Sequence, residues 1–300
     1  MEYTSISDAN VITRKYMDSI LIESRYIDSV TADLTTEFFG GKFSCPVMTP
    51  AFSHLGQYAG RELTGLEEYS IAAKNCNILN FCGMMENDLF QKIIDTGAKT
   101  VRIVKPYADN GKVRDQFAYA EAAGAFAVGM DIDHIFGANG YDNVVGEDMT
   151  FQTSDMIRSY IESTKLPFVI KGVLSVADAV KSAELGAKAI IVSHHHGRVP
   201  YAVPPMMVLP DISRALMGKD VKIIVDCGIG SGADVFKALA LGADAAAIGR
   251  SMLPSLEKEG AAGVEKYVGK IASELRYIMS SAGFAAVSDV DSSVLRFMAP

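Results

Sequence analysis

The chain has 300 residues, of which 49% are hydrophobic, and a formal net charge of −8 at pH 7. This acidic balance, with a pI near 5.2, argues against nucleic acids and anionic membranes as partners. No apolar run reaches the ~18 residues of a spanning helix, and the N-terminus lacks the basic and apolar pattern of a signal peptide. The four cysteines form no CxxC pair, so we expect free thiols in a reducing cytoplasm.

Taken in chain order, the predicted elements begin with a lead-in over residues 1–42. Within it, Ser19–Ile22 and Thr35–Phe39 are predicted to form a hairpin that closes the bottom of a barrel over residues 43–300. Eight short apolar runs then predict buried strands, at Val47–Thr49, Ile78–Phe81, Val101–Val104, Ala127–Asp131, Phe168–Ile170, Ile190–Ser193, Ile223–Val225 and Ala246–Ile248. Helical patterns separate them, for example at Glu62–Ala73, Leu89–Asp95, Gln116–Ala123 and Gly263–Ser280. The longest irregular loops are predicted at His134–Ser154 and Gly197–Pro205.

A repeated unit supports this alternation. Four segments each contain a helix tail, a Gly-Ala pair and an apolar run: Ile93–Val104, Tyr119–Met130, Lys181–Val192 and Lys237–Ile248. A glycine just past a helix is a C-cap signal, and the run after it is a buried strand. Eight strand–helix units predict a single-domain (β/α)₈ TIM barrel of the α/β class, with a doubly wound open sheet as the alternative.

Polar residues gather where these strands end, which is where barrel enzymes build their sites. They are Lys105, Asp131, Asp133, His134, Lys171, the run His194-His195-His196, Arg198, Asp226 and Arg250. The glycine-rich loop Asp226–Gly232 precedes a helix and, with Gly249-Arg250 at the next strand end, predicts a phosphate site. The alternative is that these glycines serve tight turns only.

The three histidines and Lys171 each leave choices open. Three histidines could hold a metal, but successive strand residues face opposite sides, so the spacing favours one histidine in the pocket with its neighbours bonding locally. Lys171 could be a Schiff-base lysine, a solvated lysine or a fixed charge beside a cofactor.

These motifs resemble those of the FMN-dependent 2-hydroxy acid oxidases and dehydrogenases, such as glycolate and lactate oxidase. The resemblance is strongest from Leu166 to Glu259 and includes Leu-Pro-Phe-Val-Ile-Lys-Gly-Val, Ser-His-His-His-Gly-Arg and the Asp226–Ala243 loop and helix. Weaker similarity covers Asp18–Pro50.

The resemblance implies FMN as the cofactor and oxidation of a small 2-hydroxy acid by hydride transfer to flavin N5. His195 would be the general base, Asp133 its partner, Arg198 the carboxylate ligand and Lys171 the charge beside the flavin. The implied cofactor-binding residues are Pro50, Ala51, Cys82, Lys171, Ser193, Asp226, Gly228, Gly230, Gly249 and Arg250. Lys105 and Tyr201 would add substrate contacts, and no metal is implied.

The chain departs from the family pattern at several positions. His194 and His196 replace an asparagine and a small residue, Cys227 replaces a glycine, and Gly230 stands where a phosphate-binding arginine is usual. Lys105 stands for a substrate-binding tyrosine, and we expect the N-terminal segment that supplies another tyrosine to be absent. Two alternatives therefore stay open: a redox-neutral FMN-dependent isomerase resembling type 2 isopentenyl diphosphate isomerases, and a degenerate non-catalytic barrel. The family also implies a homotetramer, for which Phe90 and Phe236 are candidate surface residues.

Overall fold

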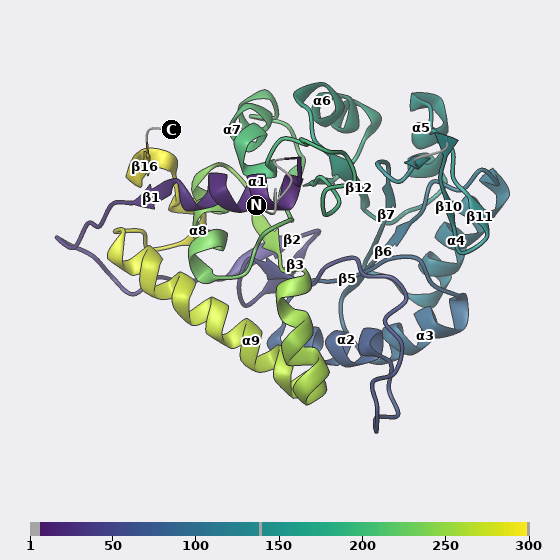
Figure 1. Ribbon diagram of the computed structural model, residues 1–300, viewed down its shortest axis with the longest axis horizontal. Helices are drawn as coiled ribbons and strands as arrows, with labels where there is room; N and C mark the ends of the chain where they lie inside the picture. Colours follow the sequence, from purple (N-terminus) through teal and green to yellow (C-terminus); the bar gives the residue numbers. More distant parts are fainter. Residues whose placement is uncertain (1–6, 138–139, 299–300) are drawn as a thin grey trace, which may run out of the picture.

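The eight predicted strands form one parallel sheet that curves into a barrel (Figure 1). The computed structural model describes residues 7–137 and 140–298. The strand order is β4-β15-β14-β13-β12-β7-β6-β5, so each strand lies beside its neighbours in the repeat. The bounds are β4 (Val47–Met48), β5 (Asn80–Cys82), β6 (Thr100–Val104), β7 (Ala127–Asp131), β12 (Phe168–Val173), β13 (Ala189–Val192), β14 (Lys222–Val225) and β15 (Ala245–Ala247).

Thr49 closes the barrel between β4 and β5. Its backbone N–H donates to the carbonyl of Leu79 at 3.2 Å. Its hydroxyl donates to Asn80 Oδ1 at 2.8 Å and accepts from the backbone N–H of Phe81 at 2.7 Å. The (β/α)₈ barrel predicted from the sequence is confirmed, and the open sheet is excluded.

One helix follows each strand and packs outside it. These helices are α2 (Gly65–Cys76), α3 (Asn87–Asp95), α4 (Asn110–Ala123), α5 (Ser154–Glu162), α6 (Val176–Leu185), α7 (Pro205–Ala215), α8 (Gly232–Ala240) and α9 (Leu253–Ser281). The glycines of all four Gly-Ala pairs have positive φ, between 77° and 104°, which is the left-handed backbone conformation that commonly ends an α-helix. The eighth helix begins earlier than predicted and is kinked at Gly260.

The hairpin at the barrel bottom differs from the prediction. Strand β1 (Ile20–Ile22) pairs with β16 (Leu295–Phe297), and β2 (Thr36–Phe38) pairs instead with β3 (Gly41–Phe43). The β2–β3 hairpin places Phe38 and Phe43 in the same core as the inward-facing strand residues, such as Phe81. Pairing Ser19–Ile22 with Thr35–Phe39 was therefore wrong, because the adjacent β3 offers a shorter connection.

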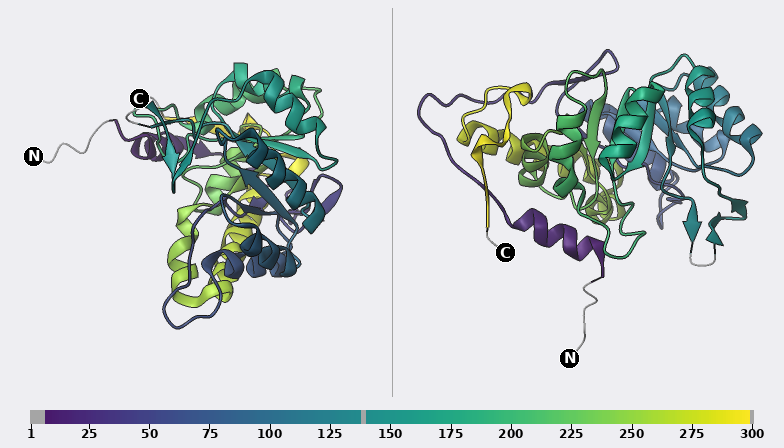
Figure 2. Two further views of the ribbon diagram at one scale, coloured as in Figure 1. Left: turned by 90° about the vertical axis from the view of Figure 1, so that its right-hand side faces the viewer. Right: turned by 90° about the horizontal axis from the view of Figure 1, so that it is seen from above.

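Several further elements lie at the carboxyl ends of the strands or at the chain ends. Helix α1 (Ala9–Asp18) lies on the same side of the barrel as the hairpins after β7 (Figure 2). The His134–Ser154 loop is not irregular, since it contains β8 (Phe136–Gly137), β9 (Gly140–Tyr141), β10 (Asn143–Val144) and β11 (Glu147–Asp148). Short 3₁₀ turns are η1 (Arg250–Met252), η2 (Val287–Asp289) and η3 (Ser292–Val294).

Phe90 and Phe236 are not surface residues. Both side chains are fully buried between the helices and the barrel. Their proposed role in a subunit interface is wrong, because the apolar face that suggested it is the face that packs inward.

Candidate active site

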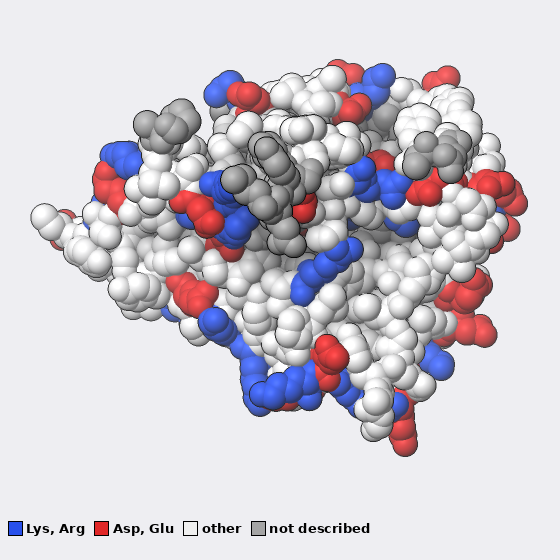
Figure 3. Space-filling model, viewed as in Figure 1, with Lys and Arg blue, Asp and Glu red and all other residues white. Residues whose placement is uncertain are grey.

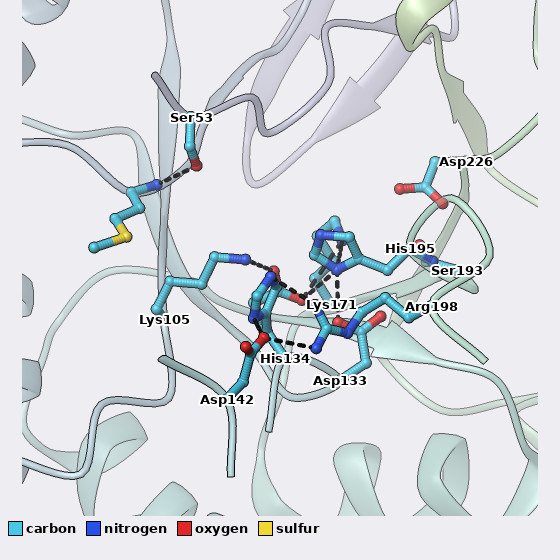
Figure 4. Close-up of polar contacts among 12 residues, drawn as sticks. Ser53, Lys105, Asp133, His134, Asp142, Lys171, Ser193, His195, Arg198 and Asp226 are labelled. Carbon is cyan, nitrogen blue, oxygen red and sulfur yellow. Dashed lines mark hydrogen bonds and ion pairs between the residues drawn. The ribbon is translucent and has the colours of Figure 1, made fainter. Parts of the chain in front are cut away.

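The polar residues predicted at the strand ends come together above the barrel (Figure 4). Lys171 belongs to β12, Asp133 follows β7, and His195 follows β13. Their side chains converge because carboxyl ends of parallel barrel strands meet at one face. The site therefore combines residues that are far apart in the sequence.

His195 is held by two aspartates and a lysine. Its Nδ1 lies 2.7 Å from Asp133 Oδ1, 3.5 Å from Asp131 Oδ1 and 3.4 Å from Lys171 Nζ. An ionised carboxylate can only accept, so the bond to Asp133 places the proton on Nδ1 and leaves Nε2 as the unprotonated nitrogen. Burial alone would lower the pKa of His195, but the charge of Asp131 and the hydrogen bond to Asp133 outweigh it, and the pKa is raised above 6.5.

The backbone that presents His195 is a turn, not a strand. β13 ends at Val192, and both His195 and His196 have left-handed φ values of 49° and 58°. Ser193 Oγ accepts from the backbone N–H of His195 at 3.1 Å, which fixes the start of this turn. Strand alternation, on which the prediction of one pocket-facing histidine rested, does not apply to this turn, and both His195 and His196 line the cavity described below.

The two neighbouring histidines differ in their surroundings. His194 is buried, where its Nε2 lies 2.8 Å from Thr13 Oγ1 and its Nδ1 accepts from the backbone N–H of Gly197 at 3.0 Å. His196 is exposed and lines the cavity described below, which the sequence did not predict. His194 thus ties α1 to the active-site turn.

Lys105 is paired inside the protein. Its Nζ lies 2.6 Å from Asp131 Oδ2, while Asp131 Oδ1 lies 3.5 Å from Lys171 Nζ, and all three residues are buried. Burial alone would raise the pKa of Asp131, but Lys105 and Lys171 outweigh it and hold the pKa well below its ordinary value. One of the three N–H donors of Lys105 is therefore used by Asp131.

Sequence reasoning noted Asp131 but gave it no role. Its signal in the sequence is an aspartate at the end of an otherwise apolar strand. Asp131, Asp133 and His195 place possible metal-ligand atoms within 4.8 Å of one another. However, the two lysine ammonium groups already balance these carboxylates, so the cluster is better suited to proton chemistry than to a cation.

Arg198 also has protein partners. Its Nη2 donates to Asp142 Oδ2 at 2.7 Å and its Nη1 donates to His134 Nε2 at 2.8 Å (Figure 4). Nη2 also donates to the backbone oxygen of Phe136 at 2.7 Å. The sequence did not single out Asp142, which lies 56 residues earlier in the chain. His134 connects Arg198 to His195, because it accepts a hydrogen bond from Arg198 and its ring packs edge-on against the His195 ring. The two ring centroids are 5.0 Å apart.

A cavity of about 350 Å³ opens next to His195. Nine of the predicted residues line it: Pro50, Ala51, Lys171, His195, Asp226, Gly228, Gly230, Gly249 and Arg250. The lining residues that the prediction did not include are Asn10, Phe52, His196, Cys227, Ile229 and Ser251. Its volume is within the usual range for small-molecule and cofactor sites.

Six predicted residues lie outside this lining: Asp133 and Arg198, whose contacts are given above, and four others. Cys82 is fully buried with its thiol toward the carbonyl of Val101, and Ser193 is buried beneath the His195 turn. Tyr201 is 66% exposed, and Lys105 is buried against Asp131.

One end of the cavity suits a phosphate group. Arg250 is exposed there beside Gly228, Gly230 and Gly249, and it has no carboxylate partner in the described part of the chain. A Cβ at Gly249 would meet no atom within 4 Å, so this wall is open to a ligand. The loop leads directly into α8, where the N–H groups of Gly230 and Gly232 already donate to Asp234 and Glu274, so Arg250 is the main candidate for a phosphate contact. Several basic side chains lie near the centre of this face (Figure 3).

A larger cavity, of about 680 Å³, lies at the opposite end of the strands. Lys222 and Asp244 line it but pair with each other at 2.7 Å. It offers no convergent set of free polar groups comparable to the site around His195.

Comparison with known proteins identifies the family. The model of the FMN-dependent dehydrogenase family matches residues 8–145 and 138–297. The chain belongs to this family. FMN is accordingly its cofactor, and the cavity with Lys171 beside it and Arg250 at one end fits that molecule.

Curated relatives include 2-hydroxy acid oxidases. An L-lactate oxidase of Nostoc sp. is 36% identical over 172 residues, which are 56% of this chain and 46% of that protein. An L-lactate oxidase of Roseobacter sp. is 40% identical over 48% of this chain and 39% of that protein. These matches therefore span less than half of either lactate oxidase. The peroxisomal (S)-2-hydroxyacid oxidase GLO3 of Arabidopsis thaliana is 27% identical over 90% of this chain and 83% of that protein.

Solved structures agree with the fold. Mandelate oxidase with benzoyl-formic acid superposes with a TM-score of 0.86 at 25% identity, covering 99% of this chain and 92% of that chain.

Among the described residues, no helix is both long and apolar enough to cross a membrane.

Proposed function

We propose that this protein oxidises a small 2-hydroxy acid to the corresponding 2-oxo acid. The observation that carries the proposal is His195, with its Nδ1 proton held by Asp133, at the edge of a cavity that fits FMN. A histidine whose Nε2 is unprotonated is suited to accept the proton of a hydroxyl group. The names of the lactate and hydroxyacid oxidases among the relatives support the substrate class.

The active-site residues of this chain would have separate roles in this oxidation. His195 Nε2 takes the substrate hydroxyl proton, and Asp133 stabilises the imidazolium that results. FMN, when bound, would supply the two-electron acceptor for the hydride of the substrate α-carbon. Lys171 keeps a positive charge next to this region: burial alone would lower its pKa, but Asp131 and Asp133 raise it above its ordinary value.

The remaining site assignments are part of the same proposal. Gly228, Gly249 and Arg250 would hold the phosphate, and Asp226, whose carboxylate can only accept hydrogen bonds, would face the ribityl hydroxyls. Pro50 and Ala51 would contact the cofactor from the same cavity. Arg198 would bind the substrate carboxylate, and this role needs its contacts with the protein to be exchanged. We assign no direct substrate contact to Lys105, because its ammonium is paired with Asp131.

The test is anaerobic reduction of the bound flavin. Protein loaded with FMN should show the visible absorption of oxidised flavin, and lactate, glycolate or mandelate should bleach it. His195→Gln should keep FMN bound but slow bleaching by at least about a hundredfold, as expected for loss of a general base. Protein that binds FMN but is bleached by no 2-hydroxy acid would refute the proposal, and turnover of a prenyl diphosphate would then favour the isomerase.

We also propose a cytoplasmic location, a homotetramer and a division into residues 1–42 and 43–300. All four cysteines are free in the structure, which is consistent with a reducing compartment. The tetramer rests on the family resemblance alone. Gel filtration with light scattering tests it directly.

A further inference from the structure

The guanidinium of Arg198 already has a carboxylate partner. Asp142, between β9 and β10, accepts from Nη2 at 2.7 Å, and both side chains are only 22% exposed. Arg198 keeps Asp142 ionised: burial alone would raise the pKa of this carboxyl, but the hydrogen bond from Arg198 and its charge lower it. The positive charge proposed for a substrate is therefore balanced from within the chain.

His134 completes this arrangement without adding charge. An arginine can only donate, so His134 Nε2 must accept from Nη1, which leaves the His134 proton on Nδ1. Burial and the nearby cations, including Lys105 and Arg198, lower the pKa of His134 to about 3, so the ring is neutral. Its Nδ1 lies 3.0 Å from Asp142 Oδ2 but forms no hydrogen bond with it in the structure.

These contacts also occupy the N–H donors that Arg198 needs to bind a carboxylate bidentately. A carboxylate is bound bidentately by two parallel N–H groups of a guanidinium, and each such pair includes an Nη2 hydrogen. Nη2 has two hydrogens and meets two acceptors, the backbone oxygen of Phe136 and Asp142 Oδ2. No pair of parallel donors remains free while both contacts persist.

Asp142 can leave by turning its side chain alone. Its backbone is anchored, since its N–H donates to the carbonyl of Ile135 and its carbonyl accepts from Met149, both at 2.8 Å. Among the described residues, the one donor to the second carboxylate oxygen, Oδ1, is the N–H of the next residue, Asn143, at 3.0 Å. Release therefore requires no rearrangement of the hairpins, only exchange of one carboxylate for another.

We propose that Asp142 is an internal competitor for Arg198, which the substrate carboxylate must displace. Asp142 is then a specificity-determining residue: it weakens the binding of all simple carboxylates and admits those whose other contacts compensate. This inference rests on the proposed function, because it takes Arg198 as the substrate's carboxylate ligand.

The experiment measures carboxylate binding without turnover. FMN-loaded wild type, Asp142→Asn and Asp142→Ala are titrated with pyruvate, and binding is followed by the change in flavin absorption. Loss of the competing charge should tighten pyruvate binding by roughly three- to thirtyfold, the range of a half-buried charged hydrogen bond. Steady-state KM for the best 2-hydroxy acid should fall in the same proportion.

Glu147→Gln is the matched control. Glu147 lies in the same pair of hairpins and its removal changes the net charge equally, but its partner is Lys112, at 2.6 Å. The control should bind pyruvate as the wild type does, and unchanged FMN affinity and melting temperature show that each variant is folded.

Three results would overturn the inference. Equal pyruvate affinity in wild type and both Asp142 variants would remove the competition while leaving the proposed function intact. Weaker binding in both would show that Asp142 orients Arg198 for the substrate. Absence of carboxylate binding in every FMN-loaded form, with no bleaching by 2-hydroxy acids, would overturn the proposed function as well.

Discussion

Gly172 controls the position of the aspartate that holds His195. It has a left-handed φ of 92°, and a Cβ built on it would lie 2.5 Å from Asp133 Cγ. Non-bonded carbons need about 3.5 Å, so in Gly172→Ala the carboxylate must move by about 1 Å. A shift of this size along the bond would lengthen the Asp133 Oδ1 to His195 Nδ1 distance from 2.7 Å to about 3.7 Å, beyond hydrogen-bond range.

We expect Gly172→Ala to lower kcat/KM about a hundredfold, since misplacement of a catalytic group by about 1 Å has an effect of this size. The variant should also lose about 1–2 kcal/mol of unfolding free energy, because a side chain is strained in the left-handed region. FMN affinity should change little, since Asp133 does not line the cavity. The assay is initial rate against substrate concentration, with FMN affinity and urea unfolding measured on the same preparations.

Gly124→Ala is the matched control. Gly124 has a nearly equal φ of 89°, but a Cβ there would meet no atom within 4 Å. It should reproduce the loss of stability while keeping wild-type kcat/KM. A Gly172→Ala enzyme with kcat/KM within threefold of the Gly124→Ala enzyme would refute the reasoning, because the clash would then not reach His195.

Three further predictions concern the charges of the site. Protonated His195 cannot act as a base, and its pKa is raised, so kcat/KM should fall as the pH decreases through an apparent pKa above 6.5. Asp131→Asn should move this acidic limb of the pH–rate profile to lower pH, because the charge of Asp131 raises the pKa of His195. An unmoved limb would contradict this assignment. Lys105→Met leaves Asp131 buried with only the more distant Lys171 and His195, so urea unfolding should show a loss of about 3 kcal/mol, largely recovered in Lys105→Met/Asp131→Asn. A loss under about 1 kcal/mol would be inconsistent with a buried pair. Arg250→Gln should raise the Kd for FMN at least about tenfold in a fluorescence titration without changing the melting temperature of FMN-free protein, and an unchanged Kd would place the phosphate elsewhere.

Local signals in the sequence were sufficient for the architecture. The Gly-Ala pairs mark helix ends, and the apolar runs after them become β6, β7, β13 and β15. Both features act over a few residues, so they can be recognised without knowing the rest of the fold. The barrel then brings every strand end to one face, which is why His195, Lys171 and Asp133 could be selected together.

Tertiary structure decided which partner each charged group takes. Lys105 pairs with Asp131, His194 with Thr13 and Arg198 with Asp142, and each pair joins segments from different repeats or from α1. The sequence around each of these carboxylates and cations does not indicate its partner. The relative positions of the loops determine which groups pair. That choice depends on distances of a few ångströms between segments far apart in the chain, because the attraction between charges depends strongly on their separation and burial. Sequence therefore determined the barrel and the residues at its active face, whereas the pairing of those residues was determined by packing.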